Sequence, residues 1–179
     1  NQAWNVPQAC RLLRRWDQAF GIDFAEAPVP IDPVDQMREL RRRVDVALCA
    51  NEGLGRVADC QRVIESRCAD VLCFSSYWVG TLGHFLRLSW TAQGAGARVC
   101  KHTHGELGIA AAAGQHALLA IPNAIDGAQQ TAALMSDDLL TEALPIASGP
   151  RWGRIEAPGL GVEVDLDKLH TFHENYLRD

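Results

Sequence analysis

The sequence predicts an α/β protein whose strands and helices form part of a β/α barrel. Short apolar runs alternate with amphipathic stretches along most of the chain, and the apolar runs end in polar residues at intervals of roughly 25 residues. Alternating strands and helices indicate parallel strands joined by right-handed crossovers. No glycine-rich phosphate-binding loop interrupts the repeat, which favours a barrel over a doubly wound sheet.

The first helix is expected to follow Asn5-Val6-Pro7, because Asn is a favoured N-cap residue and Pro is favoured in the first turn. Its apolar residues recur at helical spacing, and Gly21 ends it. Residues 22–26 are then predicted to form a strand. Asp32-Pro33 is expected to cap the second helix.

The same alternation continues through the next hundred residues. Further strands are predicted at 46–50, 70–74, 98–101 and 123–125, and helices at about 57–67, 80–93 and 107–120. After Thr131 the pattern changes to loops, a turn and strand at 159–165, and a terminal helix at 167–177. We therefore expect the βα units to occupy residues 1–135 and a segment of different character to occupy residues 136–179.

Composition excludes some classes of partner. The 179 residues include 17 Lys and Arg against 22 Asp and Glu, which gives a net charge of −5. This charge argues against a nucleic acid or an anionic membrane as the main binding partner. No apolar run approaches the ~20 residues that a membrane-spanning helix needs. The opening Asn-Gln-Ala-Trp lacks an initiator Met and a signal pattern, so it is interpreted as a cut end.

The cysteines indicate a reducing compartment, and hence a cytoplasmic protein. They form no Cys-x-x-Cys pair and no cluster with metal-ligand spacing in the sequence. Three of them lie within apolar runs, so free thiols acting as small hydrophobic side chains are expected. The six are Cys10, Cys49, Cys60, Cys68, Cys73 and Cys100.

Two carboxylates, Glu26 and Glu52, end neighbouring predicted strands. The carboxyl ends of parallel strands meet at one edge, where ligands bind. Mg²⁺ prefers oxygen ligands, so the pair predicts a magnesium site, with a solvated rim as the alternative.

His102 ends a later predicted strand and is a candidate general base. Lys101, His104 and Glu106 lie in the same stretch, so the residues alone leave the choice among them open.

These strand ends resemble the barrel of the enolase superfamily, and most closely its mandelate racemase/muconate lactonizing branch. The C-terminal segment is similar to the part of that branch that returns to an N-terminal capping domain. The matching stretches are Phe24-Ala25-Glu26-Ala27-Pro28-Val29, Ala50-Asn51-Glu52, Ser75-Ser76 ahead of Val79-Gly80, Lys101-His102-Thr103-His104-Gly105 and Pro158-Gly159-Leu160-Gly161-Val162-Glu163-Val164-Asp165.

The resemblance implies a modified β/α barrel whose Mg²⁺ is bound by carboxylates on three successive strands. Glu26 matches the second ligand and Glu52 the third. The first is an Asp of an Asp-x-Asn pattern, which would lie just before Asn1. The capping domain and a Lys-x-Lys base would also lie upstream, so the chain is expected to be the C-terminal portion of a longer enzyme, about the last five βα units with the returning segment, whose partner is its missing N-terminal half.

His102 matches the catalytic His of the mandelate racemase group. The Asp that orients this His in the family is replaced by Ser75, so the resemblance implies an imidazolium that is less stabilised and a tautomer that is less firmly fixed. Asp126 and Gln129 lie near the end of the last strand, where such enzymes contact a substrate carboxylate. The candidate substrate-binding residues are Asn51, Ser75, Lys101, His104 and Asp126.

The implied activity is Mg²⁺-dependent abstraction of a proton α to a carboxylate, with dehydration of a hydroxy (sugar) acid through an enediolate as the leading reaction. Racemisation, epimerisation or cycloisomerisation would use the same intermediate. A non-catalytic α/β binding protein is the alternative from another class. A small carboxylic acid is the expected partner, in a homo-oligomer with no nucleic acid or membrane bound.

Overall fold

The computed structural model describes residues 1–149 and 151–178. It divides into two compact units: one comprises Asn1–His102 and Leu118–Ala128, and the other comprises Thr103–Ala117 and Gln129–Asp179. Pro150 and Asp179, both within the predicted C-terminal segment, lie outside the described residues.

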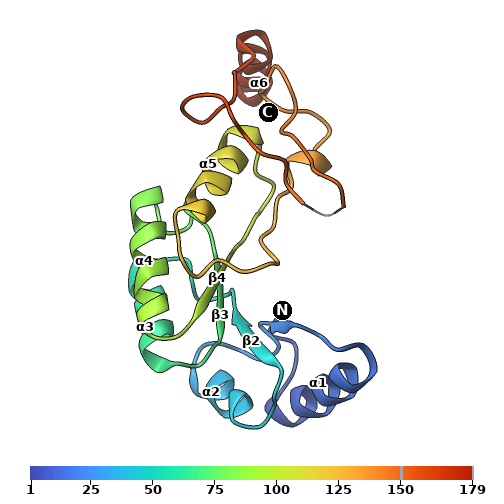
Figure 1. Ribbon diagram of the computed structural model, residues 1–179, viewed down its shortest axis with the longest axis vertical. Helices are drawn as coiled ribbons and strands as arrows, with labels where there is room; N and C mark the ends of the chain where they lie inside the picture. Colours follow the sequence, from blue (N-terminus) through green and yellow to red (C-terminus); the bar gives the residue numbers. More distant parts are fainter. Residues whose placement is uncertain (150, 179) are drawn as a thin grey trace. The chain divides into compact units, whose positions relative to one another are not determined.

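The first unit is built on a parallel sheet with the strand order β1-β2-β3-β4 (Figure 1). The register places Glu26 opposite Cys49 and Cys73 opposite Cys100. Because every pair is parallel, all four carboxyl ends lie at one edge of the sheet. The strands are β1 (Phe24–Glu26), β2 (Ala47–Ala50), β3 (Val71–Phe74) and β4 (Arg98–Lys101).

The helix α1 (Val6–Phe20) begins and ends where its sequence predicts. Asn5 and Gln8 form a capping box, in which each side chain accepts a hydrogen bond from the other residue's backbone N–H. Gly21 adopts a left-handed conformation with φ of 63°, which a glycine accepts at little cost. The capping signals were therefore sufficient to fix both ends of α1.

The predicted cap of the second helix is wrong. The helix α2 (Asp35–Arg41) has Val34 at its N-cap position, and no side-chain hydrogen bond caps it. The Asp32 carboxylate lies outside the first turn, and its Oδ1 is 3.2 Å from Nη1 of Arg62 on the helix α3 (Val57–Ser66). An ion pair with a distant helix thus takes the place of the expected local cap.

The remaining predicted helices are confirmed as α3 (Val57–Ser66), α4 (Leu82–Gly94) and α5 (Gly108–Leu119). The predicted strand at 123–125 is reduced to one parallel bridge, between Val99 and Ala124. Two backbone hydrogen bonds of 2.9 Å hold it, from Val99 N–H to Asn123 and from Ile125 N–H to Val99. The Asn123 side chain also donates to the carbonyls of Ser89 and Ala97. The fifth predicted strand is therefore present only as this bridge beside β4.

The core of the first unit lies along the strands. All of β3 is buried, α2 packs on β2, and α4 packs on β4. Burial on both faces is what a parallel sheet requires, and it explains the continuous apolar runs in the sequence. All six cysteines are buried and free.

The second unit has its own small core, in which Ala111 and Ala112 of α5 pack with Leu140 and Leu144. The predicted strand at 159–165 is present only as an antiparallel bridge between Leu140 and Val164. The terminal helix α6 (Leu166–Arg178) is confirmed, and none of its described residues is buried. Among the described residues, none belongs to a helix long and apolar enough to cross a bilayer.

Candidate active site at the strand ends

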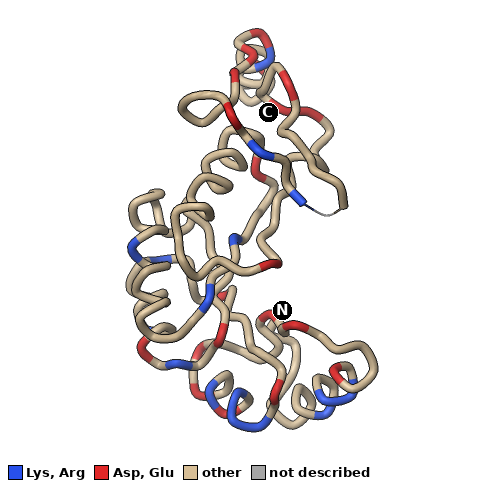
Figure 2. The backbone as a smooth tube through the Cα atoms, viewed as in Figure 1, with Lys and Arg blue, Asp and Glu red and all other residues tan. Residues whose placement is uncertain are grey.

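Polar side chains follow the carboxyl ends of the four strands of the first unit. Glu26 is the last residue of β1, and Asn51 and Glu52 follow β2. Ser75 follows β3, and His102 follows β4. In Figure 2 the strands are mostly tan while α1 and α2 carry stretches of blue and red, so charged groups are scarce along the sheet. The site therefore occupies the edge at which a parallel α/β sheet binds its ligands.

Glu26 and Asn51 are in direct contact. The amide Nδ2 of Asn51 donates a hydrogen bond of 2.5 Å to Oε1 of Glu26. Asn51 is buried and Glu26 half-buried. Ala27, directly after Glu26, has a φ of 38°, a left-handed conformation that non-glycine residues rarely adopt. Strain of this kind is concentrated at functional sites, where the surrounding structure has to hold it.

Three oxygen atoms at these strand ends are buried without a hydrogen-bond partner among the described residues. They are Oδ1 of Asn51, Oε2 of Glu52 and Oγ of Ser75. Leaving a buried polar atom unsatisfied costs about 1–3 kcal/mol, so such atoms are usually kept for an ion, water or ligand. Carboxylate and amide oxygens are also the donors that Mg²⁺ prefers. The Asn51 and Glu52 oxygens therefore fit a hard cation.

His102 is buried at the end of β4, where its backbone N–H donates to the carbonyl of Phe74. The indole of Trp78 stacks on the imidazole, with ring centroids 4.3 Å apart and an interplanar angle of 28°. Trp78 lies in the loop between β3 and α4. Sequence reasoning missed this residue, since a single aromatic residue in a loop gives no periodic signal.

The other predicted substrate contacts are dispersed. Lys101 belongs to β4, and because side chains alternate along a strand, it faces away from the side occupied by Cys100 and His102. Its Nζ donates to the His102 carbonyl. His104 is exposed and belongs to the second unit. Asp126 is exposed and lines a hollow of about 670 Å³ together with the first residues of β1 and β4.

A layer of thiols lies within the same strands, two residues before the strand-end positions. Cys49, Cys73 and Cys100 each precede a strand-end residue by two positions, and their sulfurs all lie within 4.8 Å of one another. Hydrogen bonding with Cys49 and Cys73 lowers the pKa of Cys100 against the effect of burial. The same hydrogen bonding to Cys100, together with burial, raises the pKa of Cys49 and of Cys73. Spacing in the sequence did not reveal this cluster.

Comparison with known proteins decides the family. Residues 1–168 match the model of the family described as enolase C-terminal domain-like. The chain belongs to this family. The resemblance to the mandelate racemase/muconate lactonizing branch of the enolase superfamily, and to its C-terminal barrel portion, is thereby confirmed.

The relatives that the chain matches are named for different reactions. The chain is 26% identical over its whole length to a "probable glucarate dehydratase" of Streptomyces coelicolor, of which it covers 40%. It is 29% identical, over 98% of its length, to muconate cycloisomerase 1 of Rhodococcus opacus, of which it covers 47%. A solved enolase from Streptomyces coelicolor has a TM-score of 0.87 at 28% identity, with 100% of this chain and 46% of that chain covered. The chain thus spans a little under half the length of these proteins.

Proposed function

We propose that this chain supplies metal ligands and one acid/base residue of a Mg²⁺-dependent enzyme that abstracts the proton α to a carboxylate. The observation that carries the proposal is the set of buried oxygen atoms at the ends of β2 and β3 that have no hydrogen-bond partner in the part of the chain that the structure describes. More specifically, we propose dehydration of a hydroxy (sugar) acid. The residues named below would hold Mg²⁺, which would supply the positive charge that favours an enediolate form of a carboxylate substrate.

Glu26 and Glu52 are the proposed carboxylate ligands, and the orphaned Oδ1 adds Asn51 to the ligand set. Asn51 also holds the Glu26 carboxylate in place through its amide N–H. The N-terminal segment runs beside this corner, because Gln2 N–H donates to the Ala27 carbonyl (2.6 Å) and Trp4 N–H donates to that of Pro28 (3.2 Å). An Asp just before Asn1, as the family pattern implies, would therefore approach Glu26.

His102 is the proposed general acid. Its position at the end of β4 places it at the same edge as the ligands, and stacking on Trp78 fixes the plane of its ring. Ser75 stands where the family has an orienting carboxylate, so nothing at that position stabilises the imidazolium enough to make His102 a strong base. An imidazolium without an orienting carboxylate is better suited to donate a proton to a departing hydroxide, which then leaves as water.

The experiment is a screen of the complete protein against acid sugars, with and without Mg²⁺, followed by the His102→Asn variant. We expect a keto-acid product only with Mg²⁺, and a loss of turnover of about 10²–10⁴-fold in the variant. Exchange of the α-proton with D₂O should partly survive in the variant. Full turnover without His102 would contradict its role, and an epimer as the wild-type product would replace dehydration by epimerisation.

Residues 136–179 are proposed to pack toward the capping domain of the complete enzyme. The supporting observation is that α6 has an apolar side, with Leu169 and Phe172 exposed by 43% and 39% in the described chain. Covering these side chains would remove apolar surface from water. Phe172→Ser should then lower the melting temperature of the complete protein, while Thr171→Ser on the same helix should leave it unchanged. Equal melting temperatures for both variants would contradict this packing.

A further inference from the structure

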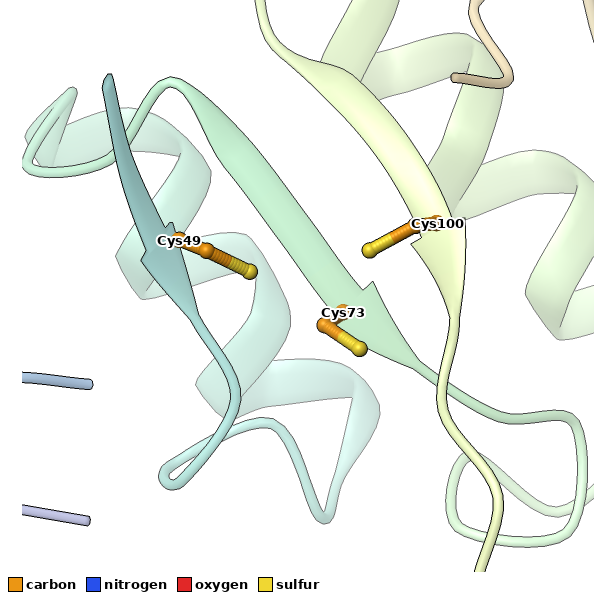
Figure 3. A group of neighbouring side chains, drawn as sticks. All are labelled: Cys49, Cys73 and Cys100. Carbon is orange, nitrogen blue, oxygen red and sulfur yellow. The ribbon is translucent and has the colours of Figure 1, made fainter. Parts of the chain in front are cut away.

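Three cysteines from three adjacent strands converge within the core of the first unit. Cys49 of β2, Cys73 of β3 and Cys100 of β4 have exposed fractions of 0%, 1% and 0%. Figure 3 shows the Cys49 and Cys100 side chains pointing toward each other, with Cys73 on the strand between them. All three sulfurs lie within 4.8 Å of one another, and no other group of three His, Cys, Asp or Glu among the described residues is as close.

This spacing is near that of a metal bound by three sulfurs. A metal–sulfur bond of about 2.3 Å, as for zinc, separates the sulfurs of a trigonal site by about 4.0 Å. Each sulfur would therefore have to move by less than about 1 Å, a shift that a rotation at χ1 can supply. Thiolate ligands select soft ions such as Cu(I) over hard ions such as Mg²⁺.

The surroundings favour three ligands rather than four. The sulfurs pack with buried Val71 and with the partly buried side chains of Phe24, Ile125 and Ala128, all of which are apolar. None of these four side chains offers an oxygen or nitrogen ligand, and the Cys49 thiol donates to the backbone carbonyl of Ala50, whose oxygen is 3.7 Å from the sulfur. A three-coordinate ion satisfied by sulfur alone fits this environment better than one that needs a fourth, oxygen ligand.

We propose that Cys49, Cys73 and Cys100 form a buried trigonal site for a soft metal ion of the Cu(I) type, distinct from the oxygen site at the strand ends. Binding replaces the S–H bonds by metal–sulfur bonds, so the thiol protons are released to solvent and no oxidation occurs. The site is independent of the proposed magnesium chemistry, because it uses none of the oxygen ligands.

The probe is Cd²⁺, added to the reduced, complete protein in the presence of saturating Mg²⁺. Bonds between cadmium and thiolate absorb in the ultraviolet, whereas cadmium bound by oxygen gives no such band. We expect the band to saturate at one Cd²⁺ per chain, with release of protons, and Cu(I) to displace the cadmium. Cys49→Ala, Cys73→Ala and Cys100→Ala should each weaken binding more than tenfold. Cys60→Ala removes an equally buried thiol outside the cluster and should bind as the wild type does.

Two further measurements keep the outcome clear if a variant folds poorly. Circular dichroism would identify such a variant, and X-ray absorption at the cadmium edge of the wild-type protein would count the sulfurs without any substitution. Three sulfurs and no oxygen support the site. The proposal is overturned if the folded protein gives no band, if binding appears only after unfolding, or if Cys60→Ala loses the band as the cluster variants do. An oxygen-containing coordination shell would also overturn it.

Discussion

Two layers of side chains on the same strands differ sharply in chemistry. The outer layer, at the strand ends, contains Asn51, Ser75 and His102, and the inner layer contains Cys49, Cys73 and Cys100. Each outer residue follows an inner one by two positions, so both layers face the same side of the sheet. Three strands thus carry hydrogen-bonding oxygen and nitrogen groups at their ends and sulfur one step inward.

The two layers differ in whether their polar atoms have interaction partners. The oxygens of Asn51 and Ser75 are buried without a partner among the described residues, which is unfavourable unless a ligand completes them. The thiols interact with one another and with apolar neighbours, and a thiol is a weak hydrogen-bonding group that tolerates burial. The outer layer is therefore incomplete without a ligand, whereas the inner layer is stable without one and would bind only an ion that replaces the thiol protons. The following predictions test whether the two layers act separately.

Removing the Glu26 carboxylate should have the largest effect. Glu26→Gln keeps the shape but removes a negative charge facing a dication, so affinity for Mg²⁺ should fall by at least about 100-fold, the upper end of what the loss of an outer-shell partner costs. Calorimetric titration of the complete protein with Mg²⁺ measures this. The thiol layer should still bind Cd²⁺. Unchanged Mg²⁺ affinity would mean that Glu26 is not a ligand.

The roles of the two residues after β2 can be distinguished by substitutions that change the charge in opposite directions. Asn51→Asp adds a carboxylate beside Glu26 and should raise the affinity for Mg²⁺ about tenfold, because the metal relieves the repulsion between two acids. Glu52→Gln should lower the affinity if Oε2 is a ligand. The same titration measures both variants. If Glu52→Gln binds Mg²⁺ as tightly as the wild type does, Asn51 alone provides the ligand from this strand end.

A change in the inner layer should leave the outer layer intact. Cys73→Ala removes one buried sulfur and should lower the free energy of unfolding by about 1 kcal/mol, a typical cost for a small deletion in a core. Affinity for Mg²⁺ should stay within twofold of the wild type. Urea unfolding and the magnesium titration give the two numbers. A loss of Mg²⁺ affinity as large as that of Glu26→Gln would show that the layers are coupled.

Most of the fold was predictable because its signals are local. Caps fixed α1, and burial on both faces of a parallel sheet produced apolar runs that located the strands. The failures arose where long-range contacts decided the outcome. Asp32 pairs with Arg62 instead of capping α2, and the strand at 123–125 is shortened to a single bridge. Neither contact has a signature in the neighbouring sequence.

For the candidate site, the positions at the strand ends were predictable, whereas the contacts between the side chains were not. Polar residues after apolar runs identified Glu26, Glu52 and His102, since the fold brings such residues to one edge. The hydrogen bond between Asn51 and Glu26 depends on strand register, which the sequence alone does not fix. Each cysteine of the cluster precedes a strand-end residue, at position 51, 75 or 102, by two positions. This shared offset is visible in the sequence, but it indicates a cluster only once the strands are known to be paired, because side chains alternate along a strand.

The smallest effect is expected from Trp78, which stacks on His102 of the outer layer. Aromatic stacking contributes about 0.5–1.5 kcal/mol, so Trp78→Leu should cost about two- to tenfold in turnover by leaving the imidazole less well oriented. Trp78→Phe keeps a stacking face and should recover most of that loss. Because the ring plane affects proton donation more than substrate binding, kcat should fall while KM changes little. The pH profile of kcat, compared among the three proteins, separates orientation from a general loss of structure. If Trp78→Leu raises KM and leaves kcat unchanged, Trp78 contacts the substrate rather than positioning His102.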